Sequence, residues 1–200
     1  MMAHILGSVI QRLAFTCAFA LAALSCARAT TPLMGTDLGS GVAPDFTLTD
    51  GLTGASFSLS SLRGSVVAMA FLYTRCPDVC PLTAGMFRAA QRALGADAAK
   101  VEFLAVSVDP EGDTPAAVRE FSSAHDLSEH WRYLVGARAQ LQPVWALYGI
   151  GSIPDPERAT VTHSDAIYLI DARGRERVLT HSDDPPDALL SDLRALLREG

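Results

Sequence analysis

The chain has 200 residues, of which 49% are hydrophobic, and a formal net charge of −6 at pH 7. This length suits one domain with a short appendage, and the hydrophobic share is sufficient for a core without a disulfide scaffold. The acidic balance excludes the basic patch with which a domain binds nucleic acid or anionic lipid, so we expect no nucleic-acid partner.

The first 29 residues have the pattern of an export signal. An uncharged apolar run at residues 13–24 follows Arg12, and Ala27-Arg28-Ala29 matches the A-x-A pattern at which signal peptidase cleaves. The run is shorter than the roughly 20 residues of a membrane-spanning helix. We therefore expect a cleaved signal, with an uncleaved anchor as the second interpretation and lipidation of Cys26 as the third. Cleavage removes two arginines and no acid, which leaves the mature chain at a net charge of −8.

The composition also indicates where the exported protein resides. Abundant arginine and alanine beside a single lysine, Lys100, are typical of a GC-rich bacterial genome. We therefore expect a periplasmic protein that is soluble or tethered to the inner membrane, and that meets a membrane only through its N-terminal segment.

Residues 30–41 are rich in Gly, Thr and Ser and are expected to form a flexible tether to a domain of residues 42–200. The pattern of the domain predicts strands at 44–49, 66–73, 101–108, 133–135, 166–170 and 177–180. It predicts helices at 81–94, 115–125, 139–148 and 186–198. A Pro-rich loop is expected at 151–160, and Gly174 indicates a hairpin turn at 171–175.

The order of these elements predicts the fold. The continuous apolar runs at 66–73 and 101–108 are typical of strands that are buried on both faces. Strands that alternate with helices indicate a central mixed sheet flanked by helices. We therefore predict a single α/β domain, thioredoxin-like, with extra N-terminal strands and a β-hairpin before the final helix. Such sheets place their chemistry at the carboxyl ends of strands.

The two cysteines of the mature domain, Cys76 and Cys80, follow one of these buried strands directly. A disulfide between them closes a loop too small to restrain the unfolded chain, which leaves redox exchange and metal binding as roles. Pro81 suits the first turn of a helix, so we expect a helix from about Pro81 with Cys80 at its mouth. The positive end of its dipole lowers the thiol pKa and favours thiolate, which attacks disulfides and binds soft metals.

His163 precedes the strand at 166–170, whose entry in a thioredoxin-like sheet packs beside the loop of the first cysteine. A neutral imidazole there would complete a site of two sulfurs and one nitrogen, which suits Cu(I), whereas structural zinc prefers four protein ligands. By position alone, a surface or capping role fits His163 equally well. That role is expected for the other histidines, His4, His125, His130 and His181.

Three motifs occur in order along the chain. They are Cys76-Pro77-Asp78-Val79-Cys80-Pro81 after Phe71-Leu72-Tyr73-Thr74, then Val106-Ser107-Val108-Asp109-Pro110-Glu111-Gly112-Asp113-Thr114-Pro115, and His163 ahead of Ile167-Tyr168-Leu169-Ile170-Asp171. With them the chain resembles, from about Pro44 to its C-terminus, the Sco/SenC family of copper-binding proteins linked to cytochrome c oxidase assembly. The resemblance implies a thioredoxin-like fold with Cys76, Cys80 and His163 as ligands of Cu(I), with Cu(II) left open.

The resemblance also implies a metallochaperone for the Cu(A) centre of cytochrome c oxidase. Its partner would be the copper-site subunit of that oxidase, with another periplasmic copper chaperone or a thiol reductase as a further one. The alternative is an enzyme, a thiol–disulfide oxidoreductase in which Cys76 and Cys80 reduce the cysteines of the oxidase copper site. A peroxiredoxin-like peroxidase, suggested by Pro44-Asp45-Phe46, is a third hypothesis that the close second cysteine disfavours.

One position departs from the family pattern, in which an acidic residue commonly precedes the histidine. Here that residue is Thr162. The three ligands are unchanged, but the acid that is expected to tune the affinity for Cu(II) is missing. Asp165 is a candidate substitute if the segment is extended. Among the other acids Asp78 is expected to stay solvated, and turn or helix-cap roles are expected for Asp109 and Asp113.

Overall fold

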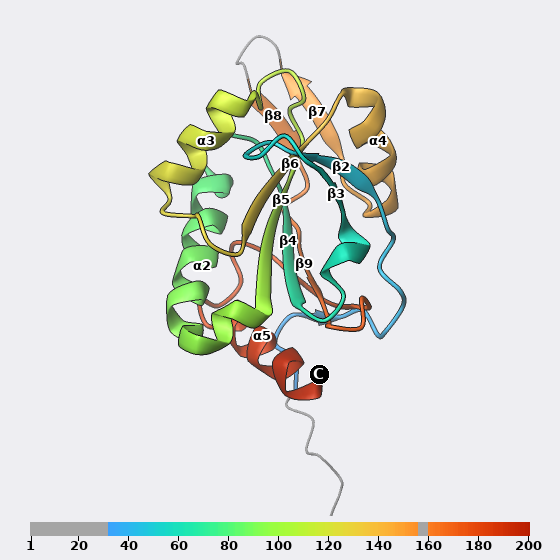
Figure 1. Ribbon diagram of the computed structural model, residues 1–200, viewed down its shortest axis with the longest axis vertical. Coiled ribbons are helices and arrows are strands. Elements are labelled where there is room, and N and C mark those ends of the chain that lie inside the picture. Colours follow the sequence, from blue (N-terminus) through green and yellow to red (C-terminus); the bar gives the residue numbers. More distant parts are fainter. Residues whose placement is uncertain (1–31, 156–159) are drawn as a thin grey trace, which may run out of the picture. The chain divides into compact units, whose positions relative to one another are not determined.

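The structure, a computed structural model, describes residues 32–155 and 160–200. The expected export signal, residues 1–29, lies outside the described residues. Eight strands form one sheet in the order β1-β10-β9-β4-β5-β6-β2-β3 (Figure 1). In chain order they are β1 (Thr36–Asp37), β2 (Thr47–Asp50), β3 (Ser56–Ser58), β4 (Val66–Leu72), β5 (Val101–Ser107), β6 (Trp131–Val135), β9 (Ile167–Ile170) and β10 (Glu176–Thr180).

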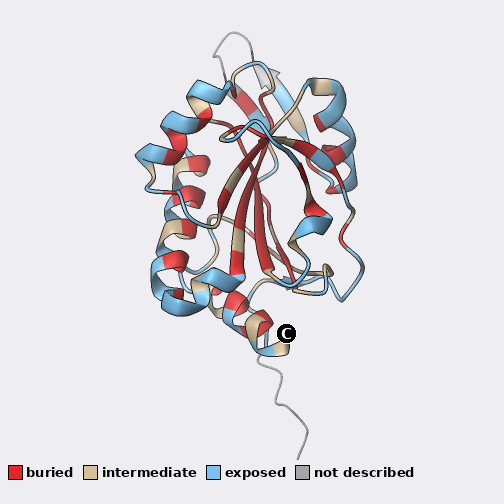
Figure 2. Cartoon of the chain, viewed as in Figure 1, coloured by how far each residue is buried: buried red, intermediate tan, exposed pale blue. Residues whose placement is uncertain are grey.

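The centre of the sheet is formed by the strands with the longest apolar runs. β4 pairs in parallel with β5, β5 pairs in parallel with β6, and β9 runs antiparallel to β4. All seven residues of β4 are buried, and in β5 only Glu102 is less than buried (Figure 2). This burial on both faces explains why both strands lack the alternating pattern of a half-exposed strand.

Within residues 32–155 and 160–200, four α-helices flank the sheet: α2 (Val79–Leu94), α3 (Pro115–Ala124), α4 (Arg138–Leu147) and α5 (Ala188–Glu199). In Figure 1, α2 and α3 lie on one side of the sheet and α4 on the other, while α5 packs against α2. Aromatic side chains join the layers, as where Phe87 of α2 contacts Phe103 of β5 with ring centroids 5.1 Å apart. Two short 3-10 helices, Leu59–Leu62 and Gly95–Lys100, complete the domain. The predicted thioredoxin-like α/β fold is confirmed.

The N-terminal strands and the final hairpin lie at the edges of the sheet. β2 and β3 form a hairpin beside β6, and β9 and β10 form the predicted hairpin, with Gly174 at φ +75° in its turn. β1, inside the expected tether, pairs with β10. Asp192 of α5 is fully buried and accepts hydrogen bonds from the amides of Met34 (2.7 Å) and Gly35 (2.9 Å). These contacts join this part of the segment to the sheet edge and to α5.

Several predicted bounds differ from the observed elements, and the strand predicted at 44–49 is observed at Thr47–Asp50. The expected loop at 151–160 contains a second sheet, in which β7 (Ser152–Asp155) pairs antiparallel with β8 (Thr160–His163). Proline disfavoured a strand in the sequence pattern, but a two-stranded ribbon has only edge strands, where proline is tolerated. The cysteine helix begins at Val79 rather than about Pro81. Because amides in the first turn have no partner within the helix, Pro81 fits there without loss of a hydrogen bond.

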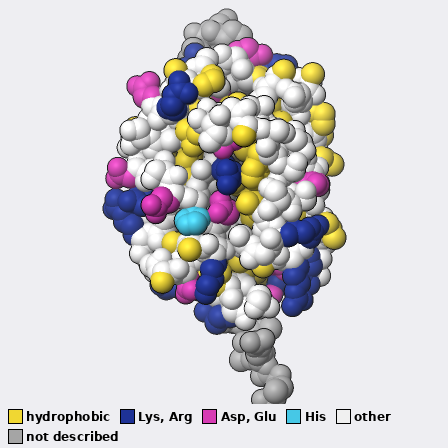
Figure 3. Space-filling model, viewed as in Figure 1, with side chains coloured by type: hydrophobic (Ala, Val, Ile, Leu, Met, Phe, Trp, Pro, Cys, Tyr) yellow, Lys and Arg dark blue, Asp and Glu magenta, His cyan; other side chains and the backbone are white. Residues whose placement is uncertain are grey.

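The surface carries charges of both signs. On the face shown in Figure 3, basic and acidic side chains are interspersed, with hydrophobic side chains between them. Arg92, for example, pairs with Asp126 at 3.3 Å, and both side chains are exposed. Across residues 32–155 and 160–200, no helix has the length and apolar character that a bilayer crossing requires.

Candidate metal centre

The topology of the sheet brings three segments that are far apart in the sequence to one edge, the edge formed by the carboxyl ends of β4 and β5. β4 and β5 are parallel and end side by side, so the segments that follow them are neighbours. β9 runs antiparallel to β4 with Ala70 opposite Ile167, so the chain enters β9 at the edge where β4 ends. Residues 73–80, 108–113 and 160–166 therefore meet at this edge. Register, and not nearness in the sequence, places the histidine beside the cysteines.

The cysteine loop is a short turn between β4 and α2. The amide of Cys76 donates a hydrogen bond to the carbonyl of Tyr73 at 3.3 Å, which closes the turn. Cys80 lies in the first turn of α2, where its amide is free to point out of the helix toward the Cys76 sulfur at 3.4 Å. Cys80 is fully buried and Cys76 is 8% exposed. Both are free thiols, so the pair is described in its reduced state.

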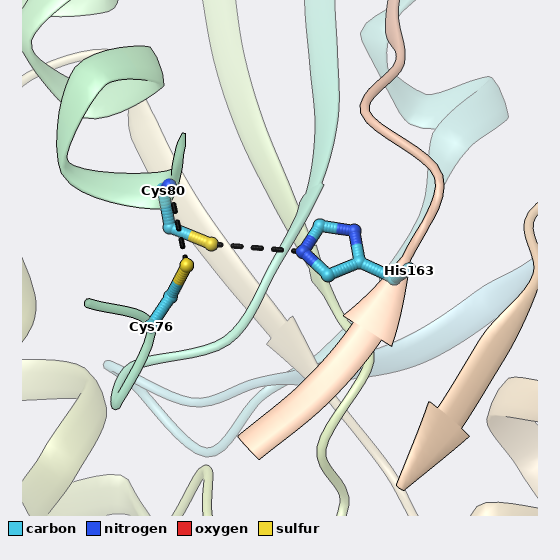
Figure 4. A group of neighbouring side chains, drawn as sticks. All are labelled: Cys76, Cys80 and His163. Carbon is cyan, nitrogen blue, oxygen red and sulfur yellow. Dashed lines mark hydrogen bonds between the residues drawn. The ribbon is translucent and has the colours of Figure 1, made fainter. Parts of the chain in front are cut away.

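His163 ends β8 and directs its ring toward the two sulfurs (Figure 4). Its Nε2 is 3.8 Å from the Cys80 Sγ, and its Nδ1 is 2.9 Å from the carbonyl oxygen of Ser164. A carbonyl only accepts hydrogen bonds, so Nδ1 carries the proton and Nε2 presents its lone pair to the sulfurs. The ring also stands edge-on to Tyr73, with centroids 5.7 Å apart, which restricts its orientation.

The ligand atoms of Cys76, Cys80 and His163 all lie within 4.8 Å of one another. Ligands of a first-row metal ion stand about 2.0–2.3 Å from it, so three of them around one ion are separated by about 3.5–4 Å. A slight contraction of the group therefore encloses a single ion. Two sulfurs and one imidazole nitrogen form a soft donor set that suits Cu(I), with one ligand fewer than structural zinc prefers.

The environment of the sulfurs gives the two cysteines opposite acidities. The hydrogen bond from Cys80 lowers the pKa of Cys76 far below its usual range, with further hydrogen bonds from the amides of Asp78 and Cys80. That same interaction with Cys76, together with burial, raises the pKa of Cys80. The reduced pair thus holds one thiolate, on the more accessible sulfur, and one protonated thiol. The lowered pKa expected from the helix N-terminus applies to Cys76, whereas Cys80 stays protonated.

Among the acidic residues near the site, some have the predicted role and others do not. Asp78 is exposed, as expected. The carboxylate of Asp165 accepts hydrogen bonds from the amide (2.9 Å) and hydroxyl (2.6 Å) of Ser182, so it is occupied away from the ring. Thr114, and not Asp113, caps α3, by accepting from the amide of Ala117 at 3.2 Å. The Asp113 side chain instead turns inward beneath the cysteine loop.

The remaining described histidines have other partners. His130 lies 3.0 Å from Glu102, His181 lies 3.9 Å from Asp184, and His125 packs against the ring of Phe121. His4 lies outside the described residues. The sequence pattern did not identify Tyr73 or Asp113 as neighbours of the site. Their positions at the end of a buried strand and within an acidic turn were the available signals.

Comparison with known proteins gives a consistent result. A family model described as SCO1/SenC matches residues 35–198. The SCO1 protein homolog of Bacillus subtilis (strain 168) is 29% identical over 150 residues, which cover 71% of this chain and 76% of that protein.

Solved structures of this family have the same fold. The structure of Bradyrhizobium japonicum ScoI with copper bound superposes with a TM-score of 0.69 at 33% identity, and the match covers 78% of this chain and 99% of that chain. BsSco, described as a member of the Sco family of cytochrome c oxidase assembly proteins with a disulfide switch, superposes with a TM-score of 0.66 at 26% identity, covering 83% and 98%. The chain belongs to the SCO1/SenC family.

Proposed function

We propose that this protein carries one copper ion, held by Cys76, Cys80 and His163, to the copper-site subunit of a cytochrome c oxidase. The observation that carries the proposal is the convergence of two sulfurs and one imidazole within 4.8 Å. Membership of the SCO1/SenC family supports it, as do the copper-bound ScoI structure and the description of BsSco as an oxidase assembly protein.

The states of the three side chains favour uptake of Cu(I). Cys76 is already a thiolate, and Nε2 of His163 faces the sulfurs while Nδ1 donates to the Ser164 carbonyl. Cys80 must give up its proton, because metal ions bind the thiolate form. Binding is therefore expected to release about one proton from the dithiol, and to become tighter as the pH rises.

The different exposure of the ligands suggests an order of release. His163 is partly exposed and Cys76 lies near the surface, whereas Cys80 is fully buried. A ligand of the partner can therefore reach the ion from the side of His163 first. Exchange through mixed-ligand states then transfers the ion without releasing it into solution.

Anaerobic titration of the reduced protein with Cu(I), against a chromophoric Cu(I) chelator, tests this proposal. We expect one tightly bound ion per chain, and a loss of affinity of at least about tenfold in His163→Ala, since even an outer-shell change commonly costs that much. His181→Ala is the matched control and is expected to bind as the unaltered protein does. Absence of tight one-to-one binding, or binding that His163→Ala leaves unchanged, would contradict the proposal.

Reduction of disulfides is a second candidate function, favoured by the thiolate of Cys76. In this alternative Cys76 attacks one sulfur of the oxidase copper-site disulfide and Cys80 resolves the mixed disulfide, so that the substrate leaves as a dithiol and the Cys76–Cys80 disulfide forms. The roles are compatible, because the same thiols must be reduced before they hold Cu(I).

The pH dependence of alkylation tests the thiolate directly. Between pH 8 and pH 6 the reactivity of an ordinary thiol falls by about 100-fold, because its pKa is near 8.5. The lowered pKa keeps Cys76 ionised over this range, so its rate with iodoacetamide is expected to fall by less than about threefold. In Cys80→Ala, which removes the donor that lowers the pKa most, the ordinary pH profile should return. An ordinary profile in the unaltered protein would remove the observation that favours a reductase.

We also infer that residues 1–29 direct export and that the domain acts in a bacterial periplasm. The apolar run, the A-x-A pattern and the two-cysteine chemistry of the mature chain support this inference. A Cu(I) site of free thiols in that compartment requires a reductant, which is consistent with a periplasmic thiol reductase as a further partner.

A further inference from the structure

A buried carboxylate lies directly beneath the cysteine loop. Asp113 is only 4% exposed, although it carries a carboxyl group. One carboxylate oxygen accepts a hydrogen bond from the amide of Thr74 at 2.8 Å, at the start of the cysteine loop. The other accepts from the hydroxyls of Ser107 (2.6 Å) and Tyr133 (3.1 Å). These bonds tie the loop to the end of β5 and to the middle of β6.

The segment that carries Asp113 also supports the strand pair that carries the histidine. The carbonyl of Val108 accepts a hydrogen bond from the hydroxyl of Ser152 at 3.1 Å, and Ser152 is the partner of His163 in the β7–β8 ribbon. The amide of Val108 in turn donates to the carbonyl of Leu72, at the end of β4, at 2.9 Å. Residues 107–113 are therefore the common support of the cysteine loop and the histidine strand.

A second contact between this segment and the loop is more exposed. Arg75 pairs with Asp109 at 2.8 Å, but the arginine side chain is 54% exposed. Solvent weakens such a pair, whereas the bonds of Asp113 are shielded and join a charge to backbone and hydroxyl donors. A Cβ at Gly112 would come within 2.0 Å of an Asp109 carboxylate oxygen, so the turn packs tightly here. Of the two contacts, that of Asp113 is the one expected to hold the loop.

We propose that Asp113 is a positioning residue of the metal centre, which holds the cysteine loop at the distance from His163 that allows all three ligands to share one ion. This inference rests on the proposed copper-binding function. It adds Asp113, which contacts none of the three ligand atoms and is not itself a metal ligand. Its physical basis is preorganisation. Cys76 lies on the cysteine loop, and Cys80 lies where this loop enters α2. The amide of Thr74 at the start of the loop is fixed by a buried carboxylate.

Replacement of the carboxylate tests this role. Asp113→Ala removes the acceptor of the Thr74 amide, and we expect Cu(I) affinity to fall by about 10- to 100-fold, as outer-shell changes commonly do. Asp113→Asn keeps one oxygen for that amide but not both, so it should recover part of the loss and not all of it. Asp192→Ala is the matched control, because Asp192 is also a buried carboxylate that accepts backbone amides, in its case two, but between α5 and the N-terminal segment. It should lose stability while its folded form binds Cu(I) within about threefold of the unaltered protein.

A double-mutant cycle with His163→Ala separates positioning from general stability. If Asp113 acts by holding the cysteines against His163, then Asp113→Ala should cost much less affinity once His163 is absent. Equal costs in both backgrounds, or an equal loss in Asp192→Ala, would overturn the inference. If Asp113→Ala does not fold, Asp113→Asn compared with Asp192→Asn serves instead, with a loss of at least about threefold expected in the first alone. Tight binding by the unaltered protein and by every Asp113 variant overturns this inference only, whereas no binding by the unaltered protein overturns the proposed function.

Discussion

Replacement of either cysteine by serine is expected to abolish tight Cu(I) binding, with an affinity loss of at least about 1,000-fold, or about 4 kcal/mol. A hydroxyl is a hard donor that stays protonated at neutral pH, so it does not replace a thiolate on a soft ion. The same substitution removes the dithiol, and with it the capacity to form the Cys76–Cys80 disulfide. Competition with a Cu(I) chelator measures the affinity, and thiol titration measures the loss of the dithiol that can form the disulfide.

Thermal unfolding with and without Cu(I) provides the control for this prediction. A ligand that binds only the folded state stabilises it, by about 2.7 kcal/mol when the free ligand is at 100 times its dissociation constant. The unaltered protein should therefore melt at a higher temperature with Cu(I), whereas Cys76→Ser and Cys80→Ser should show no shift. A serine variant that keeps affinity within about tenfold would show that this sulfur is not a ligand.

Phe103→Ala is expected to destabilise the fold by about 3–5 kcal/mol while it leaves the metal centre intact. Phe103 is fully buried in β5, where it contacts Phe87 of α2, and the substitution leaves a cavity between sheet and helix. It lies four residues before the end of β5, or about 13 Å from the metal-centre edge of the sheet. Denaturant unfolding measures the free energy, and Cu(I) titration of the folded protein is expected to give an affinity within about threefold of the unaltered one.

This variant distinguishes loss of fold from loss of site. Phe103→Leu, which fills most of the cavity, should lose less stability and bind equally well. A large affinity loss in both variants, under conditions where both are folded, would mean that the metal centre depends on packing throughout the sheet. The specific role of residues 107–113 would then have no support.

The correct and incorrect sequence predictions have identifiable physical causes. The strands at 66–73 and 101–108 were predictable because burial on both faces leaves a continuous apolar run, which few other elements produce. The β7–β8 ribbon was missed because proline is a poor strand former in general, yet it is tolerated where both strands are edges. The start of α2 was placed two residues late because a proline in the first turn costs no helix hydrogen bond.

The sequence predictions for the candidate site were likewise correct in part. The spacing of Cys76 and Cys80 and the strand before them indicated a dithiol at the end of a parallel strand, and His163 was a candidate because of the strand that follows it. The acidity of the two thiols was not predictable, since it depends on which sulfur donates to the other. Asp113 was expected to cap a helix, because a pattern of Asp, Thr and Pro does not reveal that Thr114 caps and Asp113 turns inward.

By itself, the sequence determined the central strands and the helices, their order and the donor chemistry available, because local periodicity and residue type depend only on neighbours along the chain. The tertiary structure decided that the imidazole meets sulfurs that are 83 and 87 residues away, and that a buried carboxylate lies beneath the cysteine loop. The reason is that the pairing of β9 with β4 joins segments about 100 residues apart, and such a contact forms only when the whole sheet packs.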